Sequence, residues 1–539
     1  MPSSFAAAPT RPAYAGRVDS ELDSGVRLAD ILACLSLGID LGFGQPMEHI
    51  LRQCRISMRL CDALGVDDTT RTAAYYGALL VNVGCHTDAH EQVRWFGDDI
   101  AFKSTKYVES TGKLAEVNRM LGMLGAGGHP LHRLRVGLAF ALGGHREVEA
   151  MITQHAQRAQ SLAEELHLPA AVLQGLAAAY ERWDGKGWPG ILAGPDIPTA
   201  ARLFQIAEFI EVAHRDGGVP AALSIARRGA GSQFDPAVVV CLCDHPDKIF
   251  DGLDEVGSWG ATLDEDPVLN ALTMAQLDDA LAALARYVDL KTPFTLGHTE
   301  ALTQLVIDAA GRLGFSATDR RLVHRAALTS GYGRLGISNK IWEKPGPLTV
   351  SEWERVRLAP QLGARMLRQS EALGAVAPLV GQLRERLDGS GYPAGLSAGS
   401  ITAPARLLAA ADSYQSMIEP RPYRDALTAD EAATKLRDEV RAGRLESASV
   451  DAVLGAAGHR TRRRGANIGG LTNREIEVLE LAARGLPNRE IARRLTVTPK
   501  TVGNHIEHIY TKIGETSRAG AALFAMRNGL VDETSAACR

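Results

Sequence analysis

Aromatic residues, cysteines and long apolar runs are all scarce in this sequence of 539 residues. The seven cysteines are scattered, with no Cys-x-x-Cys pair, and an odd number cannot all pair within one chain. We therefore expect reduced thiols and a cytoplasmic location rather than a disulfide-stabilised secreted protein. No uninterrupted apolar stretch is long enough to cross a bilayer, so we expect no membrane partner. The Ala/Pro/Ser-rich N-terminus favours a disordered tail over a signal peptide.

An excess of charge of one sign is also lacking. The net charge of −4 excludes a molecule that binds polyanions over its whole surface, so affinity for DNA would need a local basic patch. One such patch lies just before residue 470 and contains Arg460, Arg462, Arg463 and Arg464. Contents of 45% hydrophobic and 23% charged residues are ordinary for a soluble globular protein. The length allows about three domains.

Two stretches of the sequence align with each other without a gap. They are residues 181–208, ERWDGKGWPGILAGPDIPTAARLFQIAE, and residues 385–412, ERLDGSGYPAGLSAGSITAPARLLAAAD. A domain therefore occurs twice in the chain. In each copy an Asp-Gly-x-Gly run followed by proline predicts a loop rich in turns, and the Ala-Arg-Leu run behind it predicts the start of a helix.

The second copy carries further motifs. They are Gly297-His298-Thr299, Lys344-Pro345-Gly346-Pro347-Leu348-Thr349 and Gly391-Tyr392-Pro393. With these motifs the segment from about 290 to 440 resembles the HD-GYP phosphohydrolases. That family is all-helical and hydrolyses cyclic di-GMP at a centre of two or three metal ions. The first copy resembles the same family more faintly over about 27–240, with an additional segment near 86–140.

The resemblance implies a set of metal ligands, and few of them are present. In the second copy only His298 and Asp412 match; Ser330 and Gly331 stand at the family's His-Asp pair, and Ala359, Leu383 and Arg384 stand at its other histidines. In the first copy the matching positions hold His49, His155 and Glu208, while Val81 and Asn82 stand at the pair. We therefore expect two degenerate domains that are not enzymes and need no cofactor. His298 and Asp412 are then expected as hydrogen-bonded core residues.

One cluster in the first copy, Cys85 to Glu91, suggests an alternative. His86 and His90 are four residues apart, so a helix would place both on one face, as in helical zinc sites. Together with Asp88, His49, His155 and Glu208 they form a candidate divalent-metal or ligand site in the first domain. The other interpretation is a polar loop with an N-capping Asp88 and exposed histidines.

The segment Leu471–Leu530 has the pattern of a small helical domain. Thr472 and Glu475 are spaced as a capping box, and Thr498-Pro499 is typical of a helix start. On the helix that follows, four apolar residues recur at helical spacing, namely Val502, Ile506, Ile509 and Ile513. A generic three-helix core with solvated charges would satisfy the same pattern.

This segment closely resembles the helix-turn-helix of LuxR-type (NarL/FixJ-like) bacterial regulators. The runs Asn488-Arg489-Glu490-Ile491-Ala492 and Lys500-Thr501-Val502-Gly503-Asn504-His505 carry the resemblance, while Pro487 stands where the family usually has a Ser or Thr cap. The resemblance implies base contacts from Gly503, Asn504 and Glu507 and their neighbours His505 and His508, and phosphate contacts from Arg489, Lys500, Thr501 and Lys512. It also implies pairing through the fourth helix, where Ala519, Gly520, Ala521 and Ala522 are small enough for close approach.

The sequence therefore predicts an all-α protein with tandem HD-GYP-like domains followed by a four-helix DNA-binding domain. The expected boundaries are a tail at 1–26, domains at 27–243 and 270–457, linkers at 244–269 and 458–469, and the helix-turn-helix domain at 470–534. The expected function is a transcription regulator that binds double-stranded DNA as a homodimer, contacts RNA polymerase and senses an unknown small molecule. A metal-dependent cyclic-dinucleotide phosphodiesterase coupled to DNA binding, and a scaffold without any ligand, are the alternatives.

Overall fold

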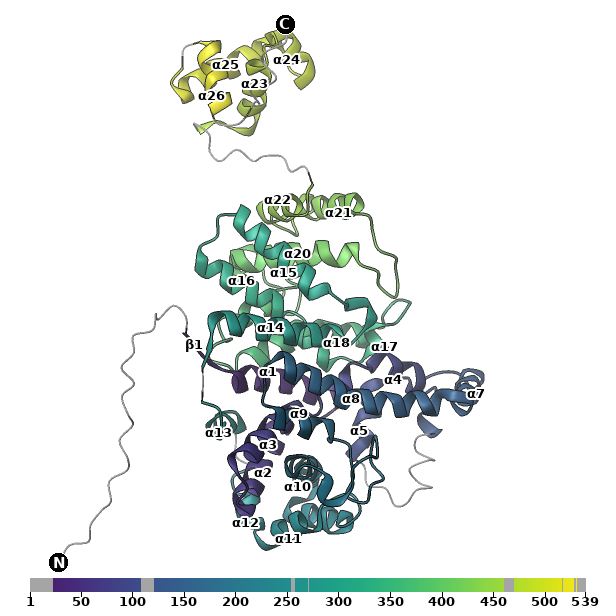
Figure 1. Ribbon diagram of the computed structural model, residues 1–539. Helices are drawn as coiled ribbons and strands as arrows, with labels where there is room; N and C mark the ends of the chain where they lie inside the picture. The colour runs from purple at the N-terminus through teal and green to yellow at the C-terminus, as the bar shows by residue number, and fades with distance from the viewer. Residues whose placement is uncertain are drawn as a thin grey trace, which may run out of the picture. The chain divides into compact units, whose positions relative to one another are not determined.

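The computed structural model describes residues 23–107, 121–253, 257–269, 271–459, 470–515, 517–527 and 530. The chain divides into two compact units, Met1–His459 and Arg460–Arg539. The described residues of both units are mostly helical, with two short strands in the first unit, which confirms the predicted all-α fold (Figure 1). Residues 1–22 of the predicted tail, and the arginine patch at 460–464, lie outside the described residues.

The first repeat begins the first unit. Its helices are α1 (Leu28–Gly42), α2 (His49–Leu64), α3 (Asp68–Leu80), α8 (His145–Glu165), α9 (Ala170–Ala177), α10 (Thr199–Gly229) and α11 (Pro236–Asp244). The additional segment between α3 and α8 contributes η1 (Val83–His86), α4 (Ala89–Phe96), α5 (Asp99–Ser104), η2 (Thr105–Tyr107), α7 (Pro130–Ala139) and the π-helical turn η3 (Phe140–Gly144). A small aromatic cluster, built around Trp95, Phe96 and Phe140, holds this segment together.

The second repeat completes the first unit. Its elements are β2 (Ala271–Thr273), α14 (Met274–Asp289), η5 (Pro293–Thr295), α15 (His298–Arg312), α16 (Ala317–Thr329), η6 (Tyr332–Gly336), α17 (Asn339–Trp342), α18 (Val350–Leu367), α19 (Ala377–Gly381), η7 (Ala398–Ser400), α20 (Ala403–Ile418), α21 (Ala429–Arg441) and α22 (Ser447–Ala456). The short turn η4 (Gly194–Asp196) lies between α9 and α10 in the first repeat. The turn η7 has the equivalent position in the second repeat, between α19 and α20.

Two predicted boundaries need correction. The tail was expected to end at residue 26, but Asp23–Arg27 form a strand, β1, that pairs antiparallel with β2. The expected linker at 244–269 contains α12 (Pro246–Phe250) and α13 (Ser258–Asp264), and both helices contact α2. Ile249 and Phe250 are buried there, which explains why this stretch packs onto the first repeat.

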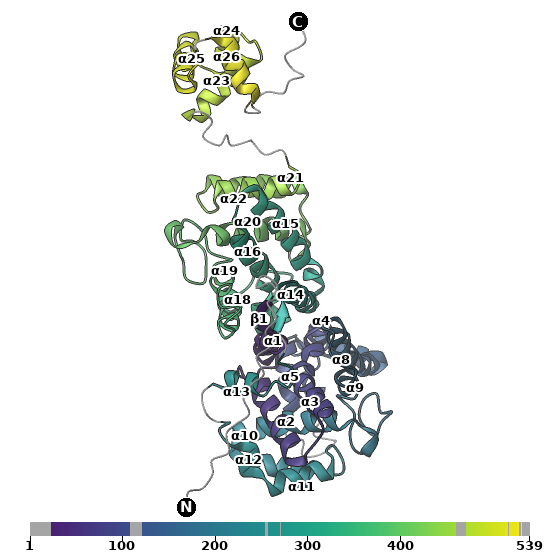
Figure 2. The same ribbon diagram turned by 60° about the vertical axis from the view of Figure 1, so that its left-hand side comes forward.

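The two repeats share one hydrophobic core. Helix α1 of the first repeat contacts η6, α14 and α18 of the second, and Figure 2 shows α1 beside α14 and β1. The contact is close at Gly38, where an added Cβ would lie 2.8 Å from a methyl carbon of Leu335. Buried side chains from both repeats therefore form a single cluster rather than two.

The second unit has four helices and its own core. They are α23 (Asn473–Ala483), α24 (Asn488–Leu495), α25 (Pro499–Ile513) and α26 (Arg518–Arg527). Thr472 and Glu475 form the predicted capping box, and Thr498 caps α25 through the Thr501 amide. Val502 and Ile509 of α25 are buried, whereas Ile506 and Ile513 are only partly covered. Among the described residues of both units, no helix has the length and apolar character to span a membrane.

Candidate functional site

The second unit presents one polar face on α25. Asn504, Glu507 and His508 are exposed there, while Val502 and Ile509 on the opposite side fill the core. Lys500 at the start of α25 and Arg489 on α24 are exposed as well, and Thr501, Gly503 and His505 are partly exposed. A helix with this division can enter the major groove without disturbing its own domain.

Lys512 differs from the other residues of the predicted DNA face. Its ammonium group lies 2.7 Å from Oε2 of Glu475, so it holds the C-terminal part of α25 against the start of α23. Burial raises the pKa of Glu475, but the hydrogen bonds from Lys512 and from Thr472 outweigh it and bring the pKa to about 2. The phosphate contact predicted for Lys512 stays a prediction, whereas its structural contact with Glu475 is an additional role.

The turn before α24 is stabilised by hydrogen bonds from an arginine of the fourth helix, α26. Pro487 occupies the N-cap position without any side-chain cap, as its departure from the family pattern suggests. Arg518 of α26 instead donates to the carbonyl groups of Leu486 and Ala482. Ala521, expected to offer close approach between two copies, is buried in the core of its own domain, so it is not available for such a contact.

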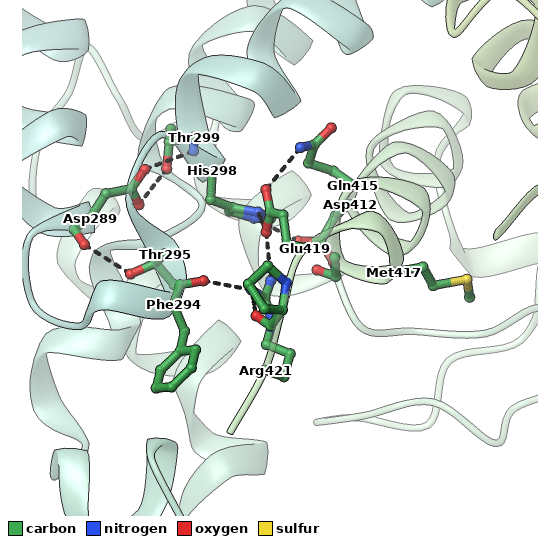
Figure 3. Close-up of polar contacts among 12 residues, drawn as sticks. Asp289, Phe294, Thr295, His298, Thr299, Asp412, Gln415, Met417, Glu419 and Arg421 are labelled. Carbon is green, nitrogen blue, oxygen red and sulfur yellow. Dashed lines mark hydrogen bonds and ion pairs between the residues drawn. The ribbon is translucent and has the colours of Figure 1, made fainter. Parts of the chain in front are cut away.

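In the second repeat, a buried polar centre forms around the first residue of α15. His298 is fully buried; its Nδ1 lies 2.8 Å from Glu419 and its Nε2 lies 3.4 Å from Asp412. Figure 3 shows His298 from α15 directed toward Glu419; Arg421 contacts the same carboxylate oxygen as His298, and Gln415 donates to the other oxygen. Burial lowers the pKa of His298, but its hydrogen bonds to Asp412 and Glu419 outweigh burial and raise it.

Two arginines add positive charge to this centre. Arg384 lies 2.7 Å from Asp412, and Arg334 lies 3.6 Å from Asp289, itself bonded to Thr299 at the start of α15. Burial raises the pKa of Asp412, yet Arg384 and His298 together hold it well below its usual range. Burial also lowers the pKa of the Arg334 guanidinium. The centre is thus a network of paired charges rather than a cage of acidic groups.

The first repeat builds a related centre at the start of α2. His49 contacts Glu211 of α10, and Arg52 donates to the same carboxylate at 2.6 Å. Glu208, one turn earlier on α10, accepts hydrogen bonds from Lys106 at 2.6 Å and Tyr107 at 2.8 Å. Burial raises the pKa of Glu211, but His49 and Arg52 bring it to about 2. His49 thus contacts Glu211, one turn from Glu208 on the same helix, and the metal or ligand site predicted for His49 and Glu208 stays a prediction.

The predicted pairing of His86 with His90 is wrong. Val83–His86 is a 3-10 turn and α4 begins only at Ala89, so the two side chains do not share a helix face. Nε2 of His86 lies 2.9 Å from the Tyr287 carbonyl, and Nδ1 of His90 lies 2.7 Å from Glu343. The alternative of an exposed polar loop also fails, because His86 is buried and Asp88 does not cap α4. Both histidines join the first repeat to the second.

Asp88 and His155 meet at a third place, with a cysteine that the sequence did not single out as a site. His155 of α8 lies with Nε2 2.6 Å from the Asp88 carboxylate and Nδ1 3.4 Å from Sγ of Cys85. The Tyr180 hydroxyl lies 3.1 Å from the same sulfur. The sequence placed Asp88 and His155 in one candidate site but did not assign Cys85 and Tyr180 to it, because the four residues come from three separate stretches of the chain.

The duplicated loop has the same construction in both repeats. Buried Glu181 accepts hydrogen bonds from the amides of Gly190, Ile191 and Leu192. Its counterpart Glu385 accepts from the amides of Ala394 and Leu396, at 2.7 and 2.8 Å. The second loop borders a pocket of about 380 Å³ lined by Leu348, Val350, Trp353, Glu354, Arg357, Ser390 and Tyr392. The motif residues therefore shape a surface beside the polar centre.

The polar centre of the second repeat offers few of the metal ligands that the family resemblance implies. Nε2 of His298 and Oδ1 of Asp412 are buried, face each other at 3.4 Å and make no conventional hydrogen bond, so these two atoms suit a cation. The other positions do not: Ser330 donates to the Ala327 carbonyl, Gly331 has no side chain, and Arg384 neutralises Asp412. Over the described ranges, no group of three or more His, Cys, Asp or Glu side chains could hold a metal ion. This donor set does not fit a centre of two or more metal ions.

Two family models match this chain, one in each of its compact units. The model of the HD domain matches residues 145–238 and 282–448. The model described as "Bacterial regulatory proteins, luxR family" matches residues 470–525. The predicted combination of HD-type and LuxR-type domains is confirmed, and the second match indicates a DNA-binding regulator.

Individual relatives resemble different parts of the chain. The 3'3'-cGAMP-specific phosphodiesterase 3 of Vibrio cholerae serotype O1 is 28% identical over 419 residues, which are 77% of this chain and 91% of that protein. The transcriptional regulatory protein LiaR of Bacillus subtilis is 38% identical over 104 residues, 19% of this chain and 49% of its own. A crystal structure of the cyclic GMP-AMP phosphodiesterase V-cGAP3 of V. cholerae has a TM-score of 0.55 at 24% identity, covering 80% of this chain and 97% of its own. At that identity the likeness shows the fold alone.

The expectation that the chain is not an enzyme is contradicted by these comparisons. A protein aligned over 91% of its length is a phosphodiesterase, and a phosphodiesterase structure shares the fold. The family's metal ligands are absent at Gly331 and Leu383. Their absence does not exclude activity, because other residues can supply the donors of an active site. The prediction that both HD-type domains are catalytically inactive is therefore wrong as a conclusion from the sequence.

Proposed function

Since the chain carries an HD domain and a C-terminal luxR-family DNA-binding domain, we propose that it is a transcription regulator whose HD repeats bind a cyclic dinucleotide. The observation that carries the DNA part is the exposed polar face of α25, with Asn504 and Lys500 outside and Val502 inside. Binding takes place on double-stranded DNA, and a two-fold operator and a contact to RNA polymerase belong to the same proposal.

The ligand part is supported by the surface beside the second polar centre. Trp353 and Tyr392 line the pocket of about 380 Å³ together with Arg357 and Ser390. An aromatic ring can stack on a nucleobase, and a guanidinium group can bind a phosphate oxygen. The relatives that hydrolyse cyclic dinucleotides support this class of ligand over other small molecules.

A direct binding measurement tests the ligand part. The purified chain is titrated with 3'3'-cGAMP and with cyclic di-GMP in a calorimeter, and binding of at least one is expected. Trp353→Ala should weaken that binding, whereas Trp353→Phe, which keeps an aromatic ring, should retain most of it. The absence of heat with both nucleotides at millimolar concentration would refute the proposed ligand class.

The DNA part has its own test. Genome-wide mapping of DNA bound by the chain identifies target fragments, and these fragments are then titrated with the chain in vitro with and without the nucleotide. A nucleotide-dependent change in affinity is expected, because coupling between two sites is reciprocal. Equal affinity for target and random fragments would contradict sequence-specific regulation.

A second candidate function is hydrolysis of the cyclic dinucleotide, which the similarity to phosphodiesterases favours. Its test is incubation of 3'3'-cGAMP and cyclic di-GMP with the chain, with and without added manganese or iron, followed by chromatography of the products. Turnover that His298→Ala abolishes would place hydrolysis in the second repeat, because His298 and Asp412 are the residues of that repeat that match the family's ligand positions. Turnover that Glu208→Gln abolishes instead would place it in the first repeat.

A further inference from the structure

Four arginines surround the buried polar centre of the second repeat, and we call them the arginine cluster. They are Arg334, Arg384, Arg386 and Arg421. Arg384 acts electrostatically on both Arg334 and Arg386, and Arg421 acts on Arg334, so the four charges lie within reach of one another. At the position of Arg384 the family resemblance implies a histidine ligand, and this chain has a permanent positive charge instead. We propose that the arginine cluster binds a phosphate group of the ligand without a divalent metal ion.

The cluster carries more positive charge than the centre neutralises. Each of the three carboxylates of the centre lies beside its own arginine. The pairs are Asp412 with Arg384 at 2.7 Å, Glu419 with Arg421 at 2.8 Å, and Asp289 with Arg334 at 3.6 Å. Arg386 instead donates to the Glu385 carbonyl at 2.9 Å and to the Ser413 hydroxyl at 3.3 Å. Since guanidinium groups stay protonated in proteins, one positive charge of the cluster is in excess of the three carboxylates.

This charge distribution suits an anion better than a divalent cation. Asp412, which matches a family ligand, is already neutralised by Arg384 and so offers little charge to a metal ion. Gly331 stands where the family has a carboxylate, and a Cβ added there would lie 3.7 Å from Nη1 of Arg334. That Nη1 is buried, makes no hydrogen bond and lies 3.6 Å from Asp289. The centre therefore presents N–H groups at a place where metal ligands were expected.

Arg384 is the member of the cluster that borders a pocket. Its side chain is 28% exposed, and Nη1 faces Asp412. Across the described residues, no hydrogen bond engages its Nε or Nη2, so these two N–H groups are available to a ligand. The Tyr392 amide donates to the Arg384 carbonyl at 3.1 Å, and Tyr392 also lines the pocket of about 380 Å³. A guanidinium fork matches two oxygens of one phosphate, so a phosphate can bind at Arg384 while the rest of the ligand occupies the pocket.

The charge of the ligand agrees with this site. Each phosphodiester group of a cyclic dinucleotide carries one negative charge, which equals the excess charge of the cluster. Identifying the phosphate as part of a cyclic dinucleotide rests on the proposed function. Binding of a phosphate anion by the cluster does not, and the two statements are therefore tested separately.

The first test uses inorganic phosphate as the probe. Thermal unfolding of the full-length chain in EDTA is followed by tryptophan fluorescence, which reports the first unit, in sodium phosphate and in sodium chloride of equal ionic strength. Phosphate should raise the midpoint of the wild type by at least about 2 °C more than that of Arg384→Gln, because a ligand of the folded state stabilises it. The general stabilisation by phosphate as a salt cancels in this comparison.

Arg406→Gln is the matched control for that variant. Arg406 also belongs to the second repeat, its side chain is 26% exposed, and it pairs with Glu446 at 2.9 Å. Because it lies outside the arginine cluster, its variant should respond to phosphate as the wild type does. Equal phosphate shifts in the wild type, Arg384→Gln and Arg406→Gln would overturn the inference.

The second test measures the affinity for 3'3'-cGAMP and cyclic di-GMP by calorimetry, with EDTA and with manganese. The Kd in EDTA should lie within about twofold of the Kd with manganese, because the guanidinium groups supply the positive charge. Arg384→Gln should raise the Kd by about tenfold or more, and Arg384→Lys by less, since lysine keeps the charge but not the fork. Binding that EDTA abolishes and manganese restores would overturn the inference. If neither nucleotide binds, the proposed ligand class fails, and the phosphate experiment decides about the cluster.

A further variant removes the excess charge without leaving a carboxylate unpaired. Arg384→Gln deprives the buried Asp412 of its arginine, so Arg386→Gln takes its place in both tests where Arg384→Gln does not fold. Arg386→Gln should weaken binding of phosphate and of nucleotide by about threefold or more, because it lowers the positive charge beside the bound anion. Binding that Arg386→Gln leaves unchanged would refute the excess charge of the cluster as its cause.

Discussion

Lys291, at the start of the second repeat, places its ammonium group 3.3 Å from the carboxylate of Asp99 in the additional segment of the first repeat. Both side chains are almost completely buried, and Lys103 lies 3.1 Å from the same carboxylate. Ser338 and the amide of Asn339 donate to its other oxygen. A carboxylate that joins two repeats in this way is costly to remove, because both lysines then remain buried without their counter-charge.

We predict that Asp99→Asn lowers the free energy of unfolding of the first unit by about 3 kcal/mol or more. Urea unfolding followed by tryptophan fluorescence measures this unit alone, since all six tryptophans precede residue 460. Glu165→Gln is the control, because it removes an exposed ion pair with Arg286 at 2.7 Å. Its effect should stay below about 1 kcal/mol. Equal losses in the two variants would mean that Asp99 contributes no more than a surface charge.

A second prediction concerns the duplicated loop. A Cβ at Gly391 would lie 2.3 Å from the Arg386 amide nitrogen and 2.4 Å from Cα of Glu385, so the backbone must move. Gly391→Ala should therefore disturb the hydrogen bonds of Glu385 to the loop amides and destabilise the first unit by about 2 kcal/mol.

Gly399→Ala is the matched control for that variant. Gly399 lies in the same loop region, yet nothing is within 4 Å of the Cβ it would gain. Its unfolding midpoint should stay within experimental error of the wild type in the same urea experiment. If Gly391→Ala is equally harmless, the close approach does not constrain the loop, and this reason for its glycine is lost.

Local features of the fold were predictable from the sequence, and long-range ones were not. The capping box of Thr472 with Glu475 and the helix start at Thr498 depend on residues three positions apart, so the pattern fixes them. The pairing of β1 with β2 joins residues 23–27 to 271–273, and no local signal carries that contact. The same holds for Lys291 with Asp99, which are 192 positions apart.

The candidate site shows the same division. His298, Asp412, His49 and Glu208 were found from motif positions, and the structure brings His298 and Asp412 within 3.4 Å of each other. Their partners Glu419 and Glu211 were missed, because a carboxylate one or two helical turns from a motif residue looks like ordinary surface charge in a sequence. His86 and His90 were misassigned since helical spacing was assumed where the chain makes a 3-10 turn followed by a new helix.

The third prediction is a pH dependence of the second unit. The pKa of Glu475 is about 2 in the folded state and about 4.3 in an unfolded chain. Because the folded pKa is the lower one, the stabilisation is present above the unfolded pKa and is lost as the pH falls toward 2. Because the Lys512 side chain is 36% exposed, solvent screening reduces this stabilisation to about 1–2 kcal/mol. Unfolding of the 470–539 fragment, followed by circular dichroism between pH 6 and pH 2, measures it.

Glu475→Gln isolates this contribution. Glutamine keeps the capping geometry but cannot titrate or pair with Lys512, so the variant should lose less stability than the wild type over the same pH range. Glu477→Gln removes a carboxylate that is half-exposed and paired with Arg474, and it should follow the wild-type curve. A wild-type curve parallel to that of Glu475→Gln would rule out the depressed pKa.

The last prediction tests the DNA face of α25. Asn504 is exposed on the side of α25 away from Val502 and Ile509. There its amide group can donate to and accept from a base edge. Asn504→Ala should therefore weaken binding to the target operator by about 1–3 kcal/mol and leave binding to random DNA unchanged. Lys500→Ala should weaken binding to both DNAs and reduce the slope of log affinity against log salt by about one, because a phosphate contact releases a counterion whatever the sequence. Lys435→Ala, which removes a positive charge from α21 of the first unit, should change neither. Fluorescence anisotropy with both DNAs over a series of salt concentrations distinguishes these outcomes. Loss of specific binding in Lys435→Ala but not in Asn504→Ala would assign DNA recognition to a different surface.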